Sequence, residues 1–306
     1  MNSLTQNVWH SGELAAQALA GVKEKMSSIG PRVIRNYMPD QHRDFFASLP
    51  LVIVGSEDKE GHLWASPLFG HPGFIQSPTP ELLTIDTSAL YSHPVSTELN
   101  IGRQVGLLGI DFETRRRNRL NGVVTGKNQL HISIKVRQSF GNCPKYIQQR
   151  RIETQIQRDQ ITRTFLSSWT SALRECIARA DTCFIASTYA AHHADECSGM
   201  DVSHRGGQPG FIEFDEHDRL TIPDYRGNFF FNTIGNLTED PRAGLLFLDF
   251  SAGNILTLTM SAEVIWKTEN PILCGEYERV IRLSLKGGYL IRNALPYRWE
   301  FMEDSM

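Results

Sequence analysis

The feature of this sequence that most constrains its fold is an internal repeat. Several short segments of the first half recur in the second half, in the same order and at nearly constant spacing. At a spacing of 137 residues these are Pro72 to Ile75 with Pro209 to Ile212, Ser66 with Ser203, and Ile85 with Ile222. At 138 residues they are Gly106 to Leu108 with Gly244 to Leu246 and Asp111-Phe112 with Asp249-Phe250, and at 131 they are Ser56 with Ser187. An order-preserving match with small insertions indicates a tandem duplication.

The length agrees with two domains. A chain of 306 residues suits two units of about 150 residues each, and we expect them to be residues 1–155 and 156–306. The net charge of −3 gives no basic footprint for nucleic acid, and no apolar run approaches the roughly 20 residues of a spanning helix. The five cysteines are odd in number and never stand in CxxC spacing, which favours reduced thiols in a cytoplasmic protein.

The pattern of apolar runs predicts mainly β structure with flanking helices. Helix formers fill residues 13–29, 40–49 and 160–180, and a short helical turn is expected at 236–242. Short apolar runs punctuated by Gly, Pro, Asn and Asp, such as 51–55, 183–187 and 243–250, are typical of antiparallel strands. The tail, 277–301, is expected to form a short helix and a strand. Each half should therefore form a closed or partly closed antiparallel barrel.

Three polar segments allow both a structural and a functional interpretation. Arg115 to Arg119 is the densest positive charge of the chain, and it suits either a solvated hairpin turn or an anion clamp. Cys143 is either a turn residue or a reactive thiol beside Lys145. His192 to Cys197 offers ligand atoms without recognisable spacing, so a solvated hairpin tip is favoured and no metal site is predicted.

The second half carries the segment that best suits a ligand. In Ser203-His204-Arg205-Gly206-Gly207 a cation is followed by glycines that permit close backbone approach, as a phosphate-bearing ligand requires. Asp224 to Asn228 and Asn232 to Asn236 add hydrogen-bonding groups in the following turns. These Asn and Gly residues could equally serve only to build turns.

At these residues the chain resembles the pyridoxamine 5′-phosphate oxidase-like FMN-binding split-barrel family. The resemblance rests on SHRGGQPGF, then D-x-x-GN, then DPRAGLLFLDF. The first half, with SPLFGHPGF, VGLLGIDF and SFGNCPKYI, is similar to the module fused ahead of flavin/iron–sulfur reductase domains. The resemblance implies tandem split barrels, bound FMN and often a homodimer. By position it implies these cofactor-binding residues: Val202, Ser203, His204, Arg205, Arg226, Asn228, Asn232, Thr233 and Asn236.

The chain also departs from the family pattern. The phosphate-gripping turn carries Asn232-Thr233 instead of a basic pair, and the C-terminal Arg-x-His substrate signature is missing from 295–306. Oxidation of pyridoxamine phosphate is therefore not expected. The leading hypothesis is an FMN-dependent oxidoreductase in which the flavin supplies the chemistry, acting on a small-molecule substrate or electron donor or with a separate reductase. The alternative is a non-catalytic protein that binds flavin or another cofactor.

The two halves should not bind flavin equally. Arg205 and Arg226 of the second half align with Leu68 and Ser88 of the first, so the first half lacks the cations. A partly buried phosphate needs cations or several N–H donors. We expect one flavin per chain, held mainly by the second half of an internal pseudo-dimer, with Arg115 to Arg119 able to reach it from the first half.

Overall fold

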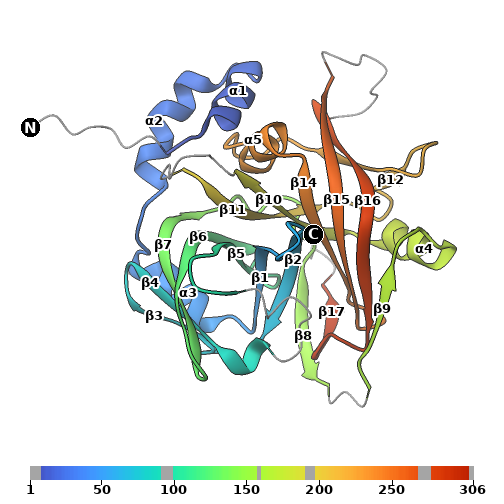
Figure 1. Cartoon of the computed structure of the whole chain (residues 1–306), viewed down its shortest axis with the longest axis horizontal. Helices are drawn as coiled ribbons and strands as arrows, with labels where there is room; N and C mark the ends of the chain where they lie inside the picture. The colour runs from blue at the N-terminus through green and yellow to red at the C-terminus, as the bar shows by residue number, and fades with distance from the viewer. Residues whose placement is uncertain (1–7, 91–98, 157–159, 190–196, 268–276, 303–306) are drawn as a thin grey trace, which may run out of the picture.

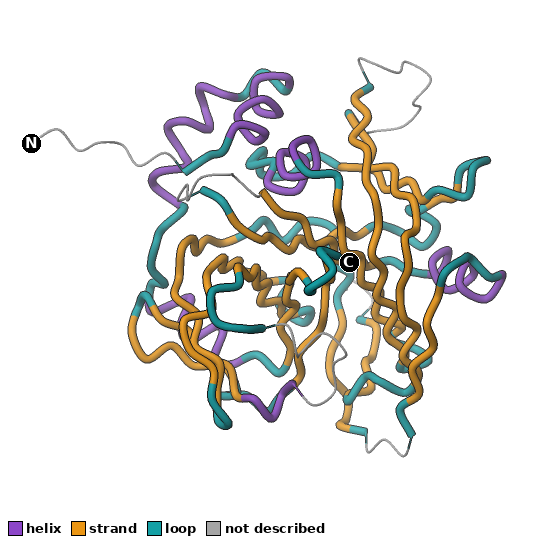
Figure 2. Tube along the Cα trace, viewed as in Figure 1, coloured by secondary structure: helices purple, strands orange, loops and turns teal. Residues whose placement is uncertain are grey.

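The computed structural model describes residues 8–90, 99–156, 160–189, 197–267 and 277–302. Strands are the commonest element of this trace, and they pair antiparallel (Figure 2). The predicted fold class, mainly β with flanking helices, is confirmed. None of the described helices is long and apolar enough to cross a membrane.

The first half forms a curved sheet of seven strands in the order β2-β1-β5-β6-β7-β4-β3 (Figure 1). Its strands are β1 (Leu51–Glu57), β2 (Leu63–Phe69), β3 (Ile75–Thr79), β4 (Leu82–Asp86), β5 (Gln104–Asp111), β6 (Arg116–Lys127) and β7 (His131–Gly141). The turn between β1 and β2 is held by Asp58, whose carboxylate accepts hydrogen bonds from the backbone of Glu60 and His62.

The second half forms a sheet in the corresponding order, β11-β10-β14-β15-β16-β13-β12. Its strands are β10 (Thr182–Tyr189), β11 (Gly199–Gly206), β12 (Glu213–Phe214), β13 (Leu220–Asp224), β14 (Arg242–Asp249), β15 (Asn254–Trp266) and β16 (Arg279–Arg292). An additional strand, β9 (Thr162–Leu166), pairs with β16. We propose the duplication of the sequence as the origin of this shared strand order; the division at residue 155 stays a prediction.

Helices flank the sheets, and one small sheet joins the linker to the tail. The helices are α1 (Ser11–Leu19), α2 (Lys23–Val33), α3 (Asp40–Ser48), α4 (Ser171–Arg179), α5 (Asn232–Glu239) and the 3-10 helix η1 (Thr87–Leu90). The small sheet pairs β8 (Arg150–Gln155) with β17 (Tyr297–Phe301). Although α1 belongs to the first half of the chain, it lies beside α5 of the second half (Figure 1).

Several helix boundaries differ from the sequence-based expectations. The segment 160–180 contains strand β9 before α4, which begins only after Thr170 caps it by accepting a hydrogen bond from the Leu173 backbone. The tail forms strands β16 and β17 where a short helix was expected at its start, because paired neighbours on both sides outweigh local propensity. The helical turn expected at 236–242 begins earlier, as α5.

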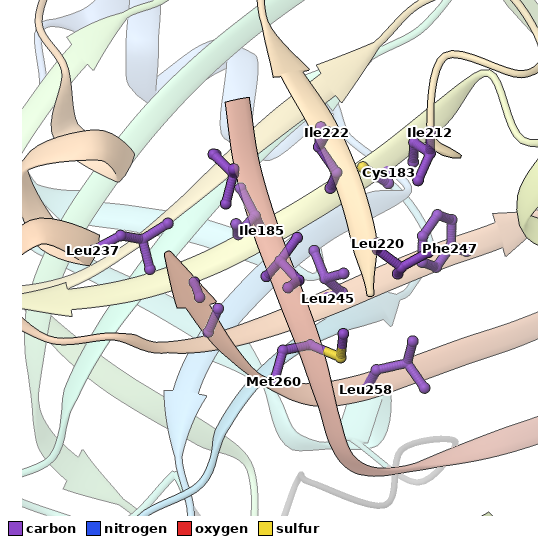
Figure 3. Close-up of a cluster of buried hydrophobic side chains, with 14 of the residues drawn as sticks. Cys183, Ile185, Ile212, Leu220, Ile222, Leu237, Leu245, Phe247, Leu258 and Met260 are labelled. Carbon is purple, nitrogen blue, oxygen red and sulfur yellow. The ribbon is translucent and has the colours of Figure 1, made fainter. Parts of the chain in front are cut away.

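The two sheets pack face to face through β1, β2 and β5 of the first and β10, β11 and β14 of the second. A shared apolar cluster includes Ile53 and Leu108 from the first sheet and Phe184, Val202 and Leu246 from the second, each at most 1% exposed. Burial of apolar surface on this scale makes the two sheets one packed body. The second sheet has a further core of its own, which includes Ile185, Leu245 and Met260 (Figure 3).

Two glycines at corresponding positions allow the sheets to approach this closely. A Cβ added at Gly106 of β5 would lie 2.6 Å from the Met200 carbonyl oxygen. One added at Gly244 of β14 would lie 2.7 Å from the Trp64 Cα and 2.8 Å from the Ala65 nitrogen. The clashing atoms belong to the backbone, so a flexible side chain cannot relieve them.

Gly244→Ala should therefore destabilise the fold by about 1–3 kcal/mol, the usual cost of forcing extra volume into a packed core. Gly126→Ala is the matched control, because a Cβ at Gly126 of β6 meets its nearest atom, the Ser133 Cβ, at an ordinary 3.4 Å. Urea denaturation of both variants measures the difference. Equal stabilities would show that the close approach of the sheets is not a constraint.

Candidate functional site

A cavity opens where the first sheet meets the second, beside the start of α5. Its volume is about 110 Å³, and it is open to solvent at its mouth. Five cationic side chains line it, against a single carboxylate, that of Asp224. The cations are Arg117, Arg119, Lys145, Arg205 and Arg279. A cavity with this charge balance favours an anionic ligand.

The structure brings most of the residues singled out from the sequence to this one cavity. Ser203, His204, Arg205, Asn228, Asn232 and Thr233 all line it. Three others of that set do not. Val202 packs into the apolar cluster between the sheets, and the Arg226 guanidinium lies over the Phe229 ring at 5.3 Å. Asn236 is fully buried one turn further along α5.

The arginines of the cluster Arg115 to Arg119 lie in two different places, and two of them reach the cavity. Arg117 donates from Nη1 to His204 Nδ1 at 2.9 Å and from Nε to the Cys143 carbonyl at 2.7 Å. Arg119 reaches Asp201 at 2.9 Å, and also the Ser203 hydroxyl. These two are on β6 with alternating side chains, so they share a face. The expectation of a cationic contribution from the first half therefore fits these two residues.

The other two arginines of the cluster lie elsewhere. Arg115 donates to the Gln149 side chain at 3.3 Å. Arg116 donates to the Gln41 carbonyl at 2.8 Å and lies 4.2 Å from the centre of the Phe45 ring. The hairpin turn that the sequence allowed for the whole cluster is thus limited to its beginning. Of the segment His192 to Cys197, only buried Cys197 is among the described residues.

A buried network fixes the floor of the cavity. Asp201 accepts hydrogen bonds from Arg119 at 2.9 Å, Asn121 Nδ2 at 2.7 Å and Asn236 Nδ2 at 2.9 Å. Thr233 donates to Ser203 at 2.9 Å. Because a buried carboxylate needs such partners to offset its desolvation, the network explains why Asn236 is buried behind the cavity instead of lining it.

A second carboxylate orients two more of the arginines that line the cavity. Asp224 lies 3.3 Å from Arg205 Nη2 and 2.6 Å from Arg279 Nε. Arg279 is only 1% exposed and also lies 4.5 Å from the centre of the Phe231 ring. Sequence reasoning missed Arg279, because it occurs in the segment where a helix was expected.

His204 is held in its neutral form. Burial, followed by the charges of Arg117, Arg205 and Arg150, lowers its pKa well below the ordinary value. Arg117 donates to Nδ1, so the proton of the neutral ring is on Nε2. Burial, and then the charges of Arg205 and Arg119, lowers the pKa of Arg117 to about 10, so this guanidinium remains charged at neutral pH.

Three of the residues lining the cavity carry a buried nitrogen without a hydrogen-bond partner among the described residues. These atoms are Nε of Arg119, Nε2 of His204 and Nε of Arg205. All three are donors, and leaving a buried donor unpaired costs about 1–3 kcal/mol. These three atoms are covered by other protein atoms in the structure, so a ligand in the cavity would reach them only if the side chains moved.

Backbone strain also concentrates here. Among the described residues, six other than glycine have positive φ, and three of them line the cavity: Tyr146 at 66°, Phe229 at 63° and Phe231 at 62°. Left-handed backbone costs bulky residues roughly 1–2 kcal/mol each and tends to occur at ligand sites. No signal in the sequence marks these residues, because aromatic side chains are not typical of this conformation.

The corresponding position on the opposite side of the interface carries no charge. Strand pairing places Ile255 and Thr257 of β15 where β6 has Arg117 and Arg119. Ile255 is buried in the cluster with Leu295, and Thr257 donates to the Ala65 carbonyl at 3.0 Å. Two sheets of the same order therefore differ here, since β15 does not repeat the arginine pair of β6.

Comparisons with known proteins give structural neighbours but no sequence relative. No family model and no curated protein matches the chain. Similar solved structures include a candidate pyridoxamine 5′-phosphate oxidase from Lactobacillus delbrueckii (13% identity, TM-score 0.28, covering 35% of this chain and 95% of that one). Another is an FMN-binding protein from Syntrophomonas wolfei (8% identity, TM-score 0.29, 40% and 96%). Likenesses this weak carry no conclusion about function.

Breaking the buried ion pair should be costly. Arg119→Met leaves Asp201 as an uncompensated buried charge, so we expect a loss of about 3–5 kcal/mol of folding free energy. The double variant Arg119→Met/Asp201→Asn should recover part of it. Arg151→Met, which removes an exposed pair with Glu300, should leave the melting temperature unchanged. A single variant as stable as the wild type would contradict this account.

The depressed pKa of His204 predicts acid sensitivity. The unfolded chain binds a proton at this histidine below a pH of about 6.5, and the folded chain does not. The contribution of this histidine to stability should therefore fall as the pH drops below that value, by up to about 1.4 kcal/mol per unit. Relative to the wild type, the melting temperature of His204→Gln should rise as the pH falls from 7 to 5, whereas that of exposed His71→Gln should not. The same slope in both variants would contradict a neutral buried His204.

Proposed function

We propose that the cavity between the sheets binds FMN and that the chain is an FMN-dependent oxidoreductase. One observation carries the proposal: cations of both sheets, Arg117 and Arg205, line the same cavity, whose lining has five cationic side chains and one carboxylate. The segment Ser203 to Arg205 resembles the FMN-binding split-barrel family, and on that basis we propose that the anion is the phosphate of FMN. The residues fit that group, since guanidinium donors bind phosphate oxygens well.

Each part of the cavity has a role in this proposal. Arg205 and Arg117 would hold the phosphate, and the backbone of β11 would support the rest of the cofactor. The volume of about 110 Å³ is large enough for a phosphate group, and the rest of the cofactor would extend from the open mouth of the cavity. Bound flavin would supply hydride or electron chemistry. The chain's own residues would bind and orient the cofactor and exclude water from it, and neutral His204 would position Arg117 by accepting its hydrogen bond at Nδ1.

A non-catalytic flavin- or cofactor-binding protein is the second candidate. It is favoured by the state of the acidic groups: Asp201 and Asp224 are both committed to arginines, and His204 is neutral and buried. None of these three is placed to exchange protons freely with a substrate. Bleaching of bound flavin by a reduced nicotinamide separates the two candidates, because only an oxidoreductase with a bound donor turns over. We also propose that the protein acts on a small-molecule substrate or electron donor, or with a separate reductase, and that it forms a homodimer.

Titration of the apo-protein with FMN tests the binding. Arg205→Ala should weaken FMN binding by about 1.5–3 kcal/mol, the range for losing a charged hydrogen bond. Arg298→Ala, which removes an exposed arginine from β17, is the control and should bind as the wild type does. Flavin fluorescence gives the affinity and the expected stoichiometry of one per chain.

Riboflavin separates loss of the phosphate contact from general damage to the cavity. It lacks the phosphate, so its affinity should be nearly the same in the wild type and in Arg205→Ala. Unchanged FMN affinity in Arg205→Ala, or two equivalent sites per chain, would place the phosphate elsewhere.

A further inference from the structure

A buried glutamate of the N-terminal segment lies directly behind the cavity. Glu13 of α1 is 3% exposed. Its Oε1 accepts a hydrogen bond from Asn232 Nδ2 at 2.5 Å, and its Oε2 accepts one from the His10 backbone at 3.0 Å. Asn232 lines the cavity, so a single amide side chain separates this carboxyl group from the proposed anion site.

Backbone packing fixes the depth of Glu13. A Cβ added at Gly12 would lie 2.2 Å from the Gly235 carbonyl oxygen, and one added at Gly235 would lie 2.5 Å from the Glu13 nitrogen. α1 and α5 thus touch through their backbones, as Figure 1 shows them side by side. Because α1 packs this closely on α5, the Glu13 carboxyl group is held in the interior and cannot easily move to the solvent.

The bond to His10 alone has a simple structural explanation. His10 is the N-cap of α1 and Glu13 is its third residue, and the two form a capping box. That motif accounts for one oxygen. It does not account for burial of the group at the α5 seam, or for the bond from Asn232.

The charged groups that face Glu13 decide its protonation. From β11 comes Asp201, from β6 Arg119, and from the segment before α1 His10, whose Nε2 lies 3.7 Å from Oε2. Arg137 of β7 shares with Glu13 and Asp201 a second, smaller cavity of about 90 Å³. On the far side of the seam, Glu239 of α5 accepts a hydrogen bond from Ser11.

Asp201 has stronger hydrogen-bond partners than Glu13. Asp201 takes the guanidinium of Arg119 and two amide donors, whereas Glu13 takes one amide and one backbone N–H. Two carboxyl groups close together in a buried site share protons, and the group with the poorer partners holds the proton. Burial first, and Asp201 second, raise the pKa of Glu13 to about 8.

We propose that Glu13 sets the charge of the ligand that the cavity accepts: protonated, it admits an anion beside Asn232, and ionised, it repels one. An anion bound in the cavity stabilises the protonated form, so binding takes up a proton from solution when the pH is near or above 8. This inference rests on the proposed function only in requiring that an anion occupies the cavity.

Sulfate is the probe, because its double charge is constant between pH 6.5 and 9.5. Its affinity for the wild type, measured by competition with FMN or directly by calorimetry, should be flat near neutrality. It should then fall roughly tenfold by pH 9.5, consistent with one linked proton. Glu13→Gln keeps the capping box, since Gln serves at that position, and should retain the neutral-pH affinity throughout. Glu24→Gln, on the exposed face of α2, should behave as the wild type.

A second measurement needs no variant. Calorimetric titration of the wild type with sulfate at pH 8.5, in two buffers of different ionisation enthalpy, should show uptake of a fraction of a proton per anion. Absence of uptake, or the same pH dependence in Glu13→Gln, would overturn the inference while leaving FMN binding intact. If neither sulfate nor FMN binds at pH 7, both the inference and the proposed function fail.

Discussion

The ion pair between Arg119 and Asp201 is the interaction on which the rest of the structure depends. It joins β6 of the first sheet to β11 of the second at 2.9 Å, with both side chains buried. Separating or sliding the sheets would leave a buried charge without its partner, and the desolvation of such a charge costs several kcal/mol. The same pair supports Ser203 in the cavity and Asn236 behind it. The ion pair that aligns the two sheets therefore also positions the side chains of the site.

Close approach of the sheets also explains why the site is asymmetric. The glycines at corresponding positions, Gly106 and Gly244, bring the two sheets together in the same way. The side chains around them differ, because Arg117 of the first sheet is replaced by Ile255 in the second. One side of the interface consequently holds cations with unpaired donors, and the other is filled by apolar packing. Two sheets with the same strand order can therefore differ in whether they bind an anion.

The sequence predicted the strands more accurately than the helices between them. It also predicted the residues that line the cavity better than the residues packed behind them. Turn residues and apolar runs located β1, β10 and β14, because both signals are local. Arg117 and Arg119 could be assigned a shared face only once the segment was known to be a strand. Contacts across the fold leave no local signal: Glu13 meets Asn232 although 219 residues separate them. For the same reason Arg279 and the strained Phe231 were missed.

A crystal structure of the protein with FMN is the most direct test of the central claim, that both sheets build one anion site. We expect a single flavin per chain, with its phosphate within hydrogen-bonding distance of Arg117 from the first sheet and Arg205 from the second. Flavin bound at the apolar side near Ile255, or held by one sheet alone, would contradict that claim.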